Sequence, residues 1–317
     1  MKAHSISKRH QAVFTVSIDF ELMWGTADRP YSADFRSLCE IERREVVDRL
    51  LGLLQEYDIS ATWGVVGYLF LDRSENVNLP RAAIAHKGPA ELFHGPDLVD
   101  RIRLCKVKQE IGSHSFCHIE MDESKCSPLA AESELAECVR QAGKLGIELK
   151  SFIFPRNLVG HLDVLKRHGF TCYRGPEPHW YAKKRRAIRR LGHLFEIAAA
   201  KTPPSVVPHE EGGIWNIPGS MLFTPSFGAR RCLPVWMRVL RARRGLDRAV
   251  SRNEIFHLWF HPTDLACRVD AMMDGLRRIF EHAARLRESG QLVIRPMGDL
   301  VPDPDFAAPE REAQLVV

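Results

Sequence analysis

The chain has 317 residues, of which 45% are apolar, so it can bury a full hydrophobic core in one large domain or two small ones. Its formal charge of +5 is mild, and nothing in it demands a nucleic acid as partner. No uncharged apolar stretch reaches the ~18 residues that are needed to cross a bilayer. A membrane-spanning protein is therefore not expected.

The cysteines and the N-terminus both bear on the cellular compartment. The eight cysteines include no CxxC pair, which is typical of reduced thiols. The first ten residues lack the apolar segment of a secretory signal. We therefore expect a cytoplasmic protein, with Cys117 buried as a small apolar residue rather than bound to a metal.

Short apolar runs alternate with amphipathic stretches along the chain. In chain order we predict a strand at 12–19, a helix at 40–57, a strand at 60–67, a helix at 97–104, a strand at 110–113, a helix at 128–145, a strand at 151–154, a helix at 162–168, a strand at 171–174, an edge or interrupted strand at 214–223, a helix at 233–250, a strand at 254–260, a helix at 266–289 and a strand at 291–295. This alternation predicts an α/β protein with a mostly parallel sheet. The gaps at 68–96 and 176–213 are expected to be long rim loops.

Polar residues follow four of these strands. Asp19 ends the first strand, His114 follows the third, Arg156 follows the fourth, and His261 ends the strand before the last long helix. In a parallel α/β architecture the site forms at the carboxyl ends of the strands. The four segments therefore bring polar side chains to one rim.

Two of these segments supply metal-ligand chemistry. His114 and His118 stand four residues apart, and Asp19 and Glu21 alternate along an extended chain, so that both carboxylates face one side. Two imidazoles and a carboxylate suit a divalent cation that keeps a position open for water. The alternative for the carboxylates is a structural ion pair with an arginine.

His261, His257 and Arg156 are each either part of the chemistry or ordinary structural residues. His261, followed by a proline at a strand end, is placed as a general acid, whereas His257 in the same strand is interpreted as a packed core histidine. Arg156 is able to orient a carboxylate through two parallel hydrogen bonds, and its alternative is an ordinary surface arginine.

Aromatic and basic residues suggest how a ligand binds. Trp24, Tyr173 and Trp180 are candidates for stacking on sugar rings, although most aromatic side chains simply fill cores. The basic helix at 233–250 suggests contact with an anionic membrane surface, or a substrate that carries phosphate, against the alternative of a solvated face.

Taken together, these motifs resemble the polysaccharide deacetylase (NodB-homology) family of carbohydrate esterases over residues 12–300. The stretch from Val16 to Glu21 resembles the family's first motif, with Phe20 where a second aspartate is usual. The His-Ser-Phe-Cys-His stretch from His114 matches the second motif well. Looser similarities to further motifs lie at Phe154-Pro155-Arg156-Asn157, Leu258-Trp-Phe-His261, and Tyr173 to Trp180.

The resemblance implies a distorted (β/α)7 barrel with long rim loops. It also implies a divalent cation, for which zinc is the first expectation. The implied reaction is hydrolytic N-deacetylation of an amino sugar in a glycan or a lipid-linked precursor. Glu21, His114 and His118 would hold the cation, Asp19 would be the base and Arg156 its support; the reverse roles of Asp19 and Glu21 stay open. The alternatives are hydrolysis of a non-sugar or cyclic amide and a non-catalytic glycan-binding protein. Residues 1–11 are expected to be an extension and 301–317 a poorly ordered tail.

Overall fold

The structure is a computed structural model of the whole chain. It describes residues 11–29, 32–75, 77–81, 89–178, 192, 196, 199–226, 230–231 and 233–301. The expected N-terminal extension and C-terminal tail lie almost wholly outside these ranges.

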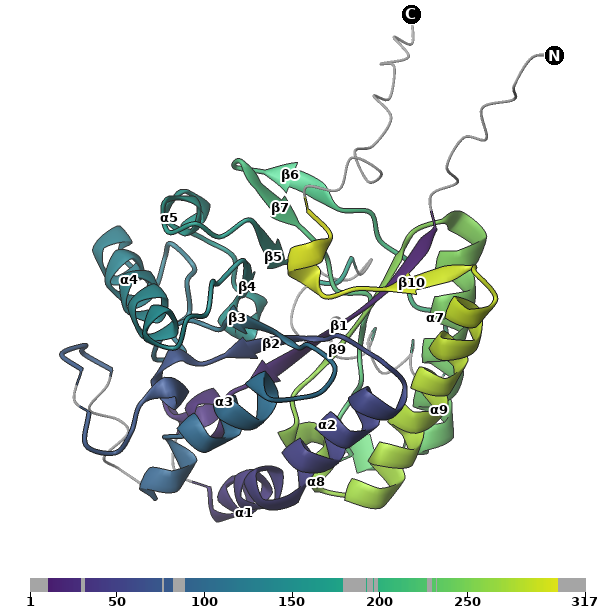
Figure 1. Cartoon of the computed structure of the whole chain (residues 1–317), viewed down its shortest axis with the longest axis horizontal. Coiled ribbons are helices and arrows are strands. Elements are labelled where there is room, and N and C mark those ends of the chain that lie inside the picture. Colours follow the sequence, from purple (N-terminus) through teal and green to yellow (C-terminus); the bar gives the residue numbers. More distant parts are fainter. Residues whose placement is uncertain are drawn as a thin grey trace, which may run out of the picture.

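One strongly curled sheet forms the centre of the molecule (Figure 1). Its strands are β1 (Ala12–Phe20), β2 (Thr62–Val65), β3 (Glu110–Ser113), β4 (Ser151–Ile153), β5 (Cys172–Arg174), β6 (His209–Glu211), β7 (Ile214–Asn216), β8 (Met221–Leu222), β9 (Ile255–Phe260) and β10 (Leu292–Ile294). All their pairings are parallel except that of β6 with β7. β1 is buried along its whole length, as expected for a parallel strand that is covered on both faces.

The sheet closes through the segment that contains β7 and β8. β7 pairs with β5, whereas β8 pairs with β9, which lies on the other side of the barrel next to β1. Between them, the Ile217 amide donates to the Tyr173 carbonyl and the Ser220 amide to that of His257. Hydrogen bonds therefore run around a ring of β1, β2, β3, β4, β5, the β7–β8 segment and β9, which confirms the predicted distorted barrel.

Helices cover the outside of the barrel (Figure 1). They are α1 (Ala33–Ile41), α2 (Val47–Glu56), α3 (Pro96–Arg103), α4 (Pro128–Lys144), α5 (Leu162–Arg167), α7 (Val235–Arg252), α8 (Thr263–Ala266) and α9 (Val269–Glu288). α7 and α9 pack side by side against the barrel, while α4 and α5 lie on the opposite side. Local sequence fixes their ends: Ser127 caps α4 by accepting from the Ala130 amide, and Pro128 takes the first helical position.

Most predicted elements are present, and the differences concern how they begin and end. The helix expected at 40–57 begins earlier, because Ser32 caps α1, and it passes through a π-helical turn at Glu42–Val46. The helix expected at 266–289 is divided into α8 and α9, because Arg268 leaves the helical conformation. Apolar spacing detects neither change, since the apolar face continues across both.

None of the helices that the structure describes combines the length and the apolar character needed to cross a bilayer. The basic helix expected at 233–250 is α7, and two of its arginines are turned inward. Arg238 donates to the carbonyls of Thr224, Pro225, Arg230 and Leu233, and Arg241 donates to that of Lys201. The structure therefore lends no support to the expected membrane contact, because buried donors are not available to lipid headgroups.

Candidate active site

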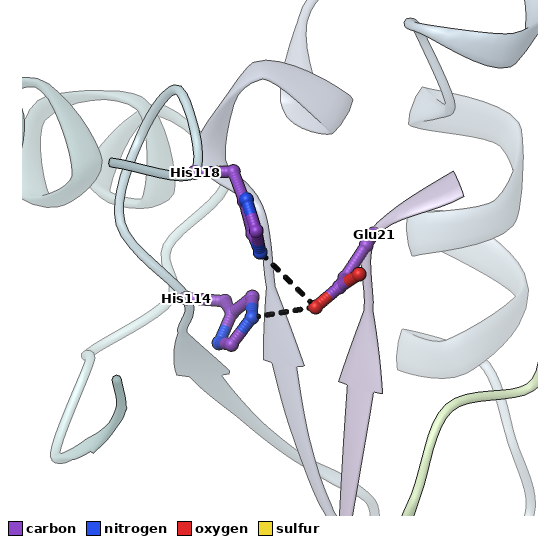
Figure 2. A group of neighbouring side chains, drawn as sticks. All are labelled: Glu21, His114 and His118. Carbon is purple, nitrogen blue, oxygen red and sulfur yellow. Dashed lines mark hydrogen bonds and ion pairs between the residues drawn. The ribbon is translucent and has the colours of Figure 1, made fainter. Parts of the chain in front are cut away.

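Glu21, His114 and His118 converge at the carboxyl end of the barrel (Figure 2). Glu21 directly follows β1, and its Oε1 lies 2.9 Å from Nε2 of His114 and 3.2 Å from Nε2 of His118. The histidine side chains are buried, and that of Glu21 is 12% exposed. Gly25 makes room for this carboxylate, because a Cβ at that position would fall 1.9 Å from Glu21 Oε2.

The hydrogen bonds of this cluster fit a cation. Nδ1 of His114 donates to the Ile153 carbonyl at 2.8 Å, so in the neutral ring Nε2 presents a lone pair toward Glu21. Burial lowers the pKa of His118, which favours the neutral form of that ring. Burial opposes ionisation of Glu21, but the neighbouring imidazoles hold its pKa well below the usual range. A carboxylate oxygen and the Nε2 atoms of two imidazoles thus lie close together, which is a donor set suited to a divalent cation.

A buried glutamate shapes the loop that carries the histidines. Ser115 and His118 both adopt positive φ, which residues other than glycine rarely do. Glu134 of α4 accepts hydrogen bonds from the amides of Phe116 and Cys117 at 2.9 and 2.7 Å and so stabilises this turn. Cys117 itself is buried and free, as predicted. The role of Glu134 was missed, since nothing in a helical glutamate indicates a contact with a distant loop.

Asp19 lies beside the cluster in a two-pronged ion pair with Arg174, the last residue of β5. The two guanidinium nitrogens lie 2.5 and 2.7 Å from the two carboxylate oxygens, and both side chains are buried. Burial opposes ionisation of Asp19, but Arg174 lowers its pKa below the usual value. Asp19 therefore remains an anion at the edge of the cluster.

The expectation that Arg156 supports Asp19 is wrong. Arg156 adopts positive φ in the short turn after β4, and its guanidinium pairs with Asp28, at 2.6 Å, and with Glu120. The arginine that pairs with Asp19 comes instead from β5. Arg174 was not singled out, although it lies in the stretch from Tyr173 to Trp180 that loosely resembles a family motif.

A second layer of hydrogen bonds fixes the ion pair. Arg174 donates to Oγ of Ser17 at 3.1 Å, and that hydroxyl donates to Nε2 of His257 at 2.8 Å. Nδ1 of His257 in turn donates to the Pro218 carbonyl. His257 is fully buried, which confirms the prediction of a packed core histidine.

His261 lies at the mouth of the site, at the end of β9. Its Nε2 is 3.5 Å from Glu21 Oε1 and 3.7 Å from Asp19 Oδ2, and its Nδ1 donates to Asp264 at 2.9 Å. Burial lowers the pKa of His261, but Asp264 and Glu21 outweigh it and raise that pKa well above the usual value. The imidazole is therefore held protonated and oriented, as a general acid requires. Asp264 was not predicted, although a carboxylate three residues after a candidate acid is a visible clue.

The expected substrate-binding aromatics need correction. Trp24 is buried, donates to the Phe93 carbonyl and packs on Tyr68, because a 3-10 turn directs it into the core. Tyr173 is likewise buried, with its hydroxyl bonded to Glu211. Trp180 lies outside the described residues. Among the described residues, the aromatic side chains that line the site are Phe35 and Trp259, and Arg174 stacks over Trp259 at 4.2 Å.

An open cavity of about 370 Å³ lies over these groups. This volume falls within the usual range for small-molecule sites. Its lining residues come from several rim segments: Asp19, Glu21, Gly25, Thr26, Arg29, Phe35, His118, Arg156, Asn157, Leu222, Pro225, Arg230, Trp259, His261, Thr263 and Asp264. The predicted gathering of remote strand ends is thus present, with a solvent-accessible space above it.

Arg174→Lys and Arg174→Met test the role of Arg174 as a positioning residue. We expect kcat for the reaction proposed below to fall roughly 10²-fold in either variant, because lysine lacks the fork that holds both oxygens of Asp19. Arg174→Met should also raise the pKa of the acidic limb of the pH–rate profile, whereas Arg174→Lys should largely keep it. A purely structural role predicts lower stability and unchanged limbs, so that profile is the deciding measurement.

The buried His257 makes stability depend on pH. Burial, reinforced by Arg174, lowers the pKa of His257 to about 3, against ~6.5 in the unfolded chain. Between these values only the unfolded state takes up the proton, so this contribution to stability is complete above pH ~6.5 and is lost as pH falls toward ~3, up to about 5 kcal/mol. In denaturant titrations from pH 7 to 4, His257→Asn should show a shallower loss than the wild type. The exposed His209→Asn is the matched control, and equal slopes in all three proteins would refute the prediction.

The distorted parallel barrel is the fold of solved structures named as polysaccharide deacetylases, and in this chain its rim carries a carboxylate and two histidines. A structure from Mycobacterium smegmatis whose name assigns it to the polysaccharide deacetylases matches with a TM-score of 0.62 and 15% identity, over 93% of this chain and 91% of the other. A probable polysaccharide deacetylase from Pseudomonas aeruginosa PAO1 matches with a TM-score of 0.60 and 14% identity, over 91% and 90%.

The PuuE allantoinase matches equally well, with a TM-score of 0.60 and 14% identity, over 91% of this chain and 88% of the other. No protein-family model matches the chain, and neither does any curated protein. At these identities the neighbours establish the fold, and the reaction has to be argued from the site.

Proposed function

We propose that the protein hydrolyses the N-acetyl group of an amino sugar and releases acetate and the free amine. The observation that carries this proposal is the convergence of Glu21, His114 and His118 beside Asp19, with His261 at 3.5 Å from Glu21. Amide hydrolysis needs an activated water, a base and an acid for the departing amine. The site contains side chains suited to each need within one cavity.

Glu21, His114 and His118 are the residues that would hold a divalent cation, of which zinc is the first choice for two nitrogen ligands and one oxygen ligand. When bound there, such a cation supplies a Lewis acid that activates water and polarises the amide carbonyl. Asp19 is the less suitable ligand of the two carboxylates, because both of its oxygens are already held by Arg174.

Asp19 accepts the proton of the water as it attacks the carbonyl carbon. Arg174 keeps this carboxylate ionised and pointed at the cavity. His261, charged and held by Asp264, donates a proton to the nitrogen of the departing amine as the C–N bond breaks. His257 and Ser17 fix Arg174 from behind and do not contact the substrate.

Hydrolysis of a cyclic amide is the second candidate, because the allantoinase shares the fold. The cluster of Glu21, His114 and His118 favours deacetylation, because it offers the ligands of a cation that would polarise an acetamide carbonyl. A glycan-binding protein without activity would have no need of a charged His261, held by Asp264, beside Glu21.

Acetate release tests the proposal directly. The purified protein, supplied with Zn²⁺, is incubated with N-acetylglucosamine oligomers, and acetate is measured by an enzyme-coupled assay; allantoin is tested in parallel. We expect acetate from the oligomers and no consumption of allantoin. Allantoin turnover that survives a chelator, without acetate release, would establish the second candidate instead.

A further inference from the structure

Two arginines line the catalytic cavity but take no part in the site described above. Arg29, in the turn that follows the 3-10 helix after β1, and Arg230, shortly before α7, both line the catalytic cavity. Arg29 is exposed and Arg230 is half-buried. Both guanidinium groups are therefore within reach of a ligand that enters from solvent.

The other charged groups of the cavity have partners of opposite charge. Asp19 pairs with Arg174, Asp264 with His261, and Arg156 with Asp28 and Glu120. Glu21 faces the two histidines. Within the described part of the chain, by contrast, neither Arg29 nor Arg230 forms an ion pair with a carboxylate. The wall thus carries two positive charges that no described carboxylate pairs with.

The fold positions Arg230 in spite of an unfavourable charge environment. Arg238 of α7 donates to the carbonyl of Arg230 and to that of Leu233, which fixes the backbone from which Arg230 extends. Burial lowers the pKa of Arg238 to about 10, and the nearby cations Arg268 and Arg230 add to this shift. Asp264, the acid that offsets these cations at Arg238, is itself paired with His261. The excess of positive charge therefore favours an anion from outside.

We propose that the substrate carries an anionic group, and that Arg29 and Arg230 bind this group while the amide of the substrate lies at Glu21, His114 and His118. A guanidinium matches the oxygens of a phosphate or a carboxylate with parallel hydrogen bonds, which suits a phosphorylated amino sugar or an amino-sugar acid. The identity of the reacting amide rests on the function proposed above, whereas binding of the anion does not.

Binding of the products tests this without turnover. Glucosamine 1-phosphate, glucosamine 6-phosphate and glucosamine are titrated calorimetrically into the Zn²⁺-loaded protein. We expect at least one of the phosphorylated sugars to bind 10-fold or more tightly than glucosamine at low salt, with a preference that shrinks as ionic strength rises. The double variant R29Q/R230Q should lose most of that preference.

The matched control is R231Q/R243Q, which removes two exposed arginines that do not line the cavity and changes the net charge equally. Its preference should stay within twofold of the wild type. Equal binding of charged and neutral sugars by the wild type, or an equal loss in both double variants, would overturn the proposal.

Two further ligands identify the source of the anion. A methyl phosphodiester of glucosamine 1-phosphate imitates a sugar linked to a lipid or a nucleotide through phosphate, and glucosaminuronic acid carries a carboxylate. Tighter binding of either one than of glucosamine, lost in R29Q/R230Q, supports the proposal and names the class. Acetate release from neutral oligomers, with no preference for anionic sugars in binding, would reject this inference and leave the deacetylase function standing. A preference for anionic sugars, with no acetate release from any acetylated sugar, would support the anion site and reject the deacetylase function.

Discussion

Replacement of Glu21 by alanine is expected to remove one equivalent of tightly bound divalent metal and to reduce acetate release more than 10³-fold. The carboxylate oxygen lies 2.9 and 3.2 Å from the two imidazoles, so without it only two nitrogen ligands remain at the rim. Two ligands do not hold zinc in competition with water as three do. Metal content after dialysis and the rate of acetate release are the measurements.

Two further variants separate the loss of a ligand from a general disturbance. Glu123→Ala removes an exposed carboxylate from the stretch that follows the histidine loop and should keep both metal and activity. Gly25→Ala keeps every ligand but places a Cβ on Glu21 Oε2, so metal affinity should fall by about tenfold or more. Full metal content in Glu21→Ala would mean that the ion is bound at another site.

Asp19→Asn is expected to reduce kcat by about 10³-fold or more while the metal stays bound. An amide has nearly the same shape as the carboxylate and still accepts one hydrogen bond from Arg174, but it does not take the proton of the attacking water. Because KM depends on binding rather than on this proton transfer, it should change less than threefold. Steady-state kinetics on the metal-loaded variant, with metal content measured in the same sample, provide the test.

Asp28→Asn is the matched control, because it also removes a carboxylate from an arginine ion pair, at a side chain that is 35% exposed. Its kcat should stay within a few-fold of the wild type. The Asp19 variant loses a buried partner of Arg174, so its melting temperature is measured as well. A folded, metal-loaded Asp19→Asn with a normal kcat would remove this residue from the base role.

Sequence was sufficient for the residues that follow strands in a parallel sheet. Asp19, His114 and His261 each stand at a strand end, and the carboxyl ends of parallel strands meet at one rim whatever the details of the loops. Glu21 and His118 followed from the same rule, since each is only a few residues beyond a strand end. The mostly parallel sheet was predictable because apolar runs and amphipathic stretches alternate throughout the chain, whereas the barrel was expected from the family resemblance.

Sequence was insufficient wherever a side chain's direction depends on tertiary contacts. Trp24 and Trp259 are both near the rim, yet the first turns into the core and the second lines the cavity, and no local pattern separates them. Arg156 and Arg174 pose the same problem, because the short turn at positive φ directs the first away from Asp19. Strand β5 directs Arg174 toward Asp19, and the position of β5 depends on its pairing with strand β4.

The position of a bound ion tests the central claim most directly. Crystals grown or soaked with Co²⁺ would be measured at the cobalt absorption edge, where anomalous scattering locates the ion independently of any assumption about ligands. We expect one strong peak within coordination distance of Glu21, His114 and His118. A peak away from these three residues, or none at a Co²⁺ concentration that supports acetate release, would contradict the proposed active site.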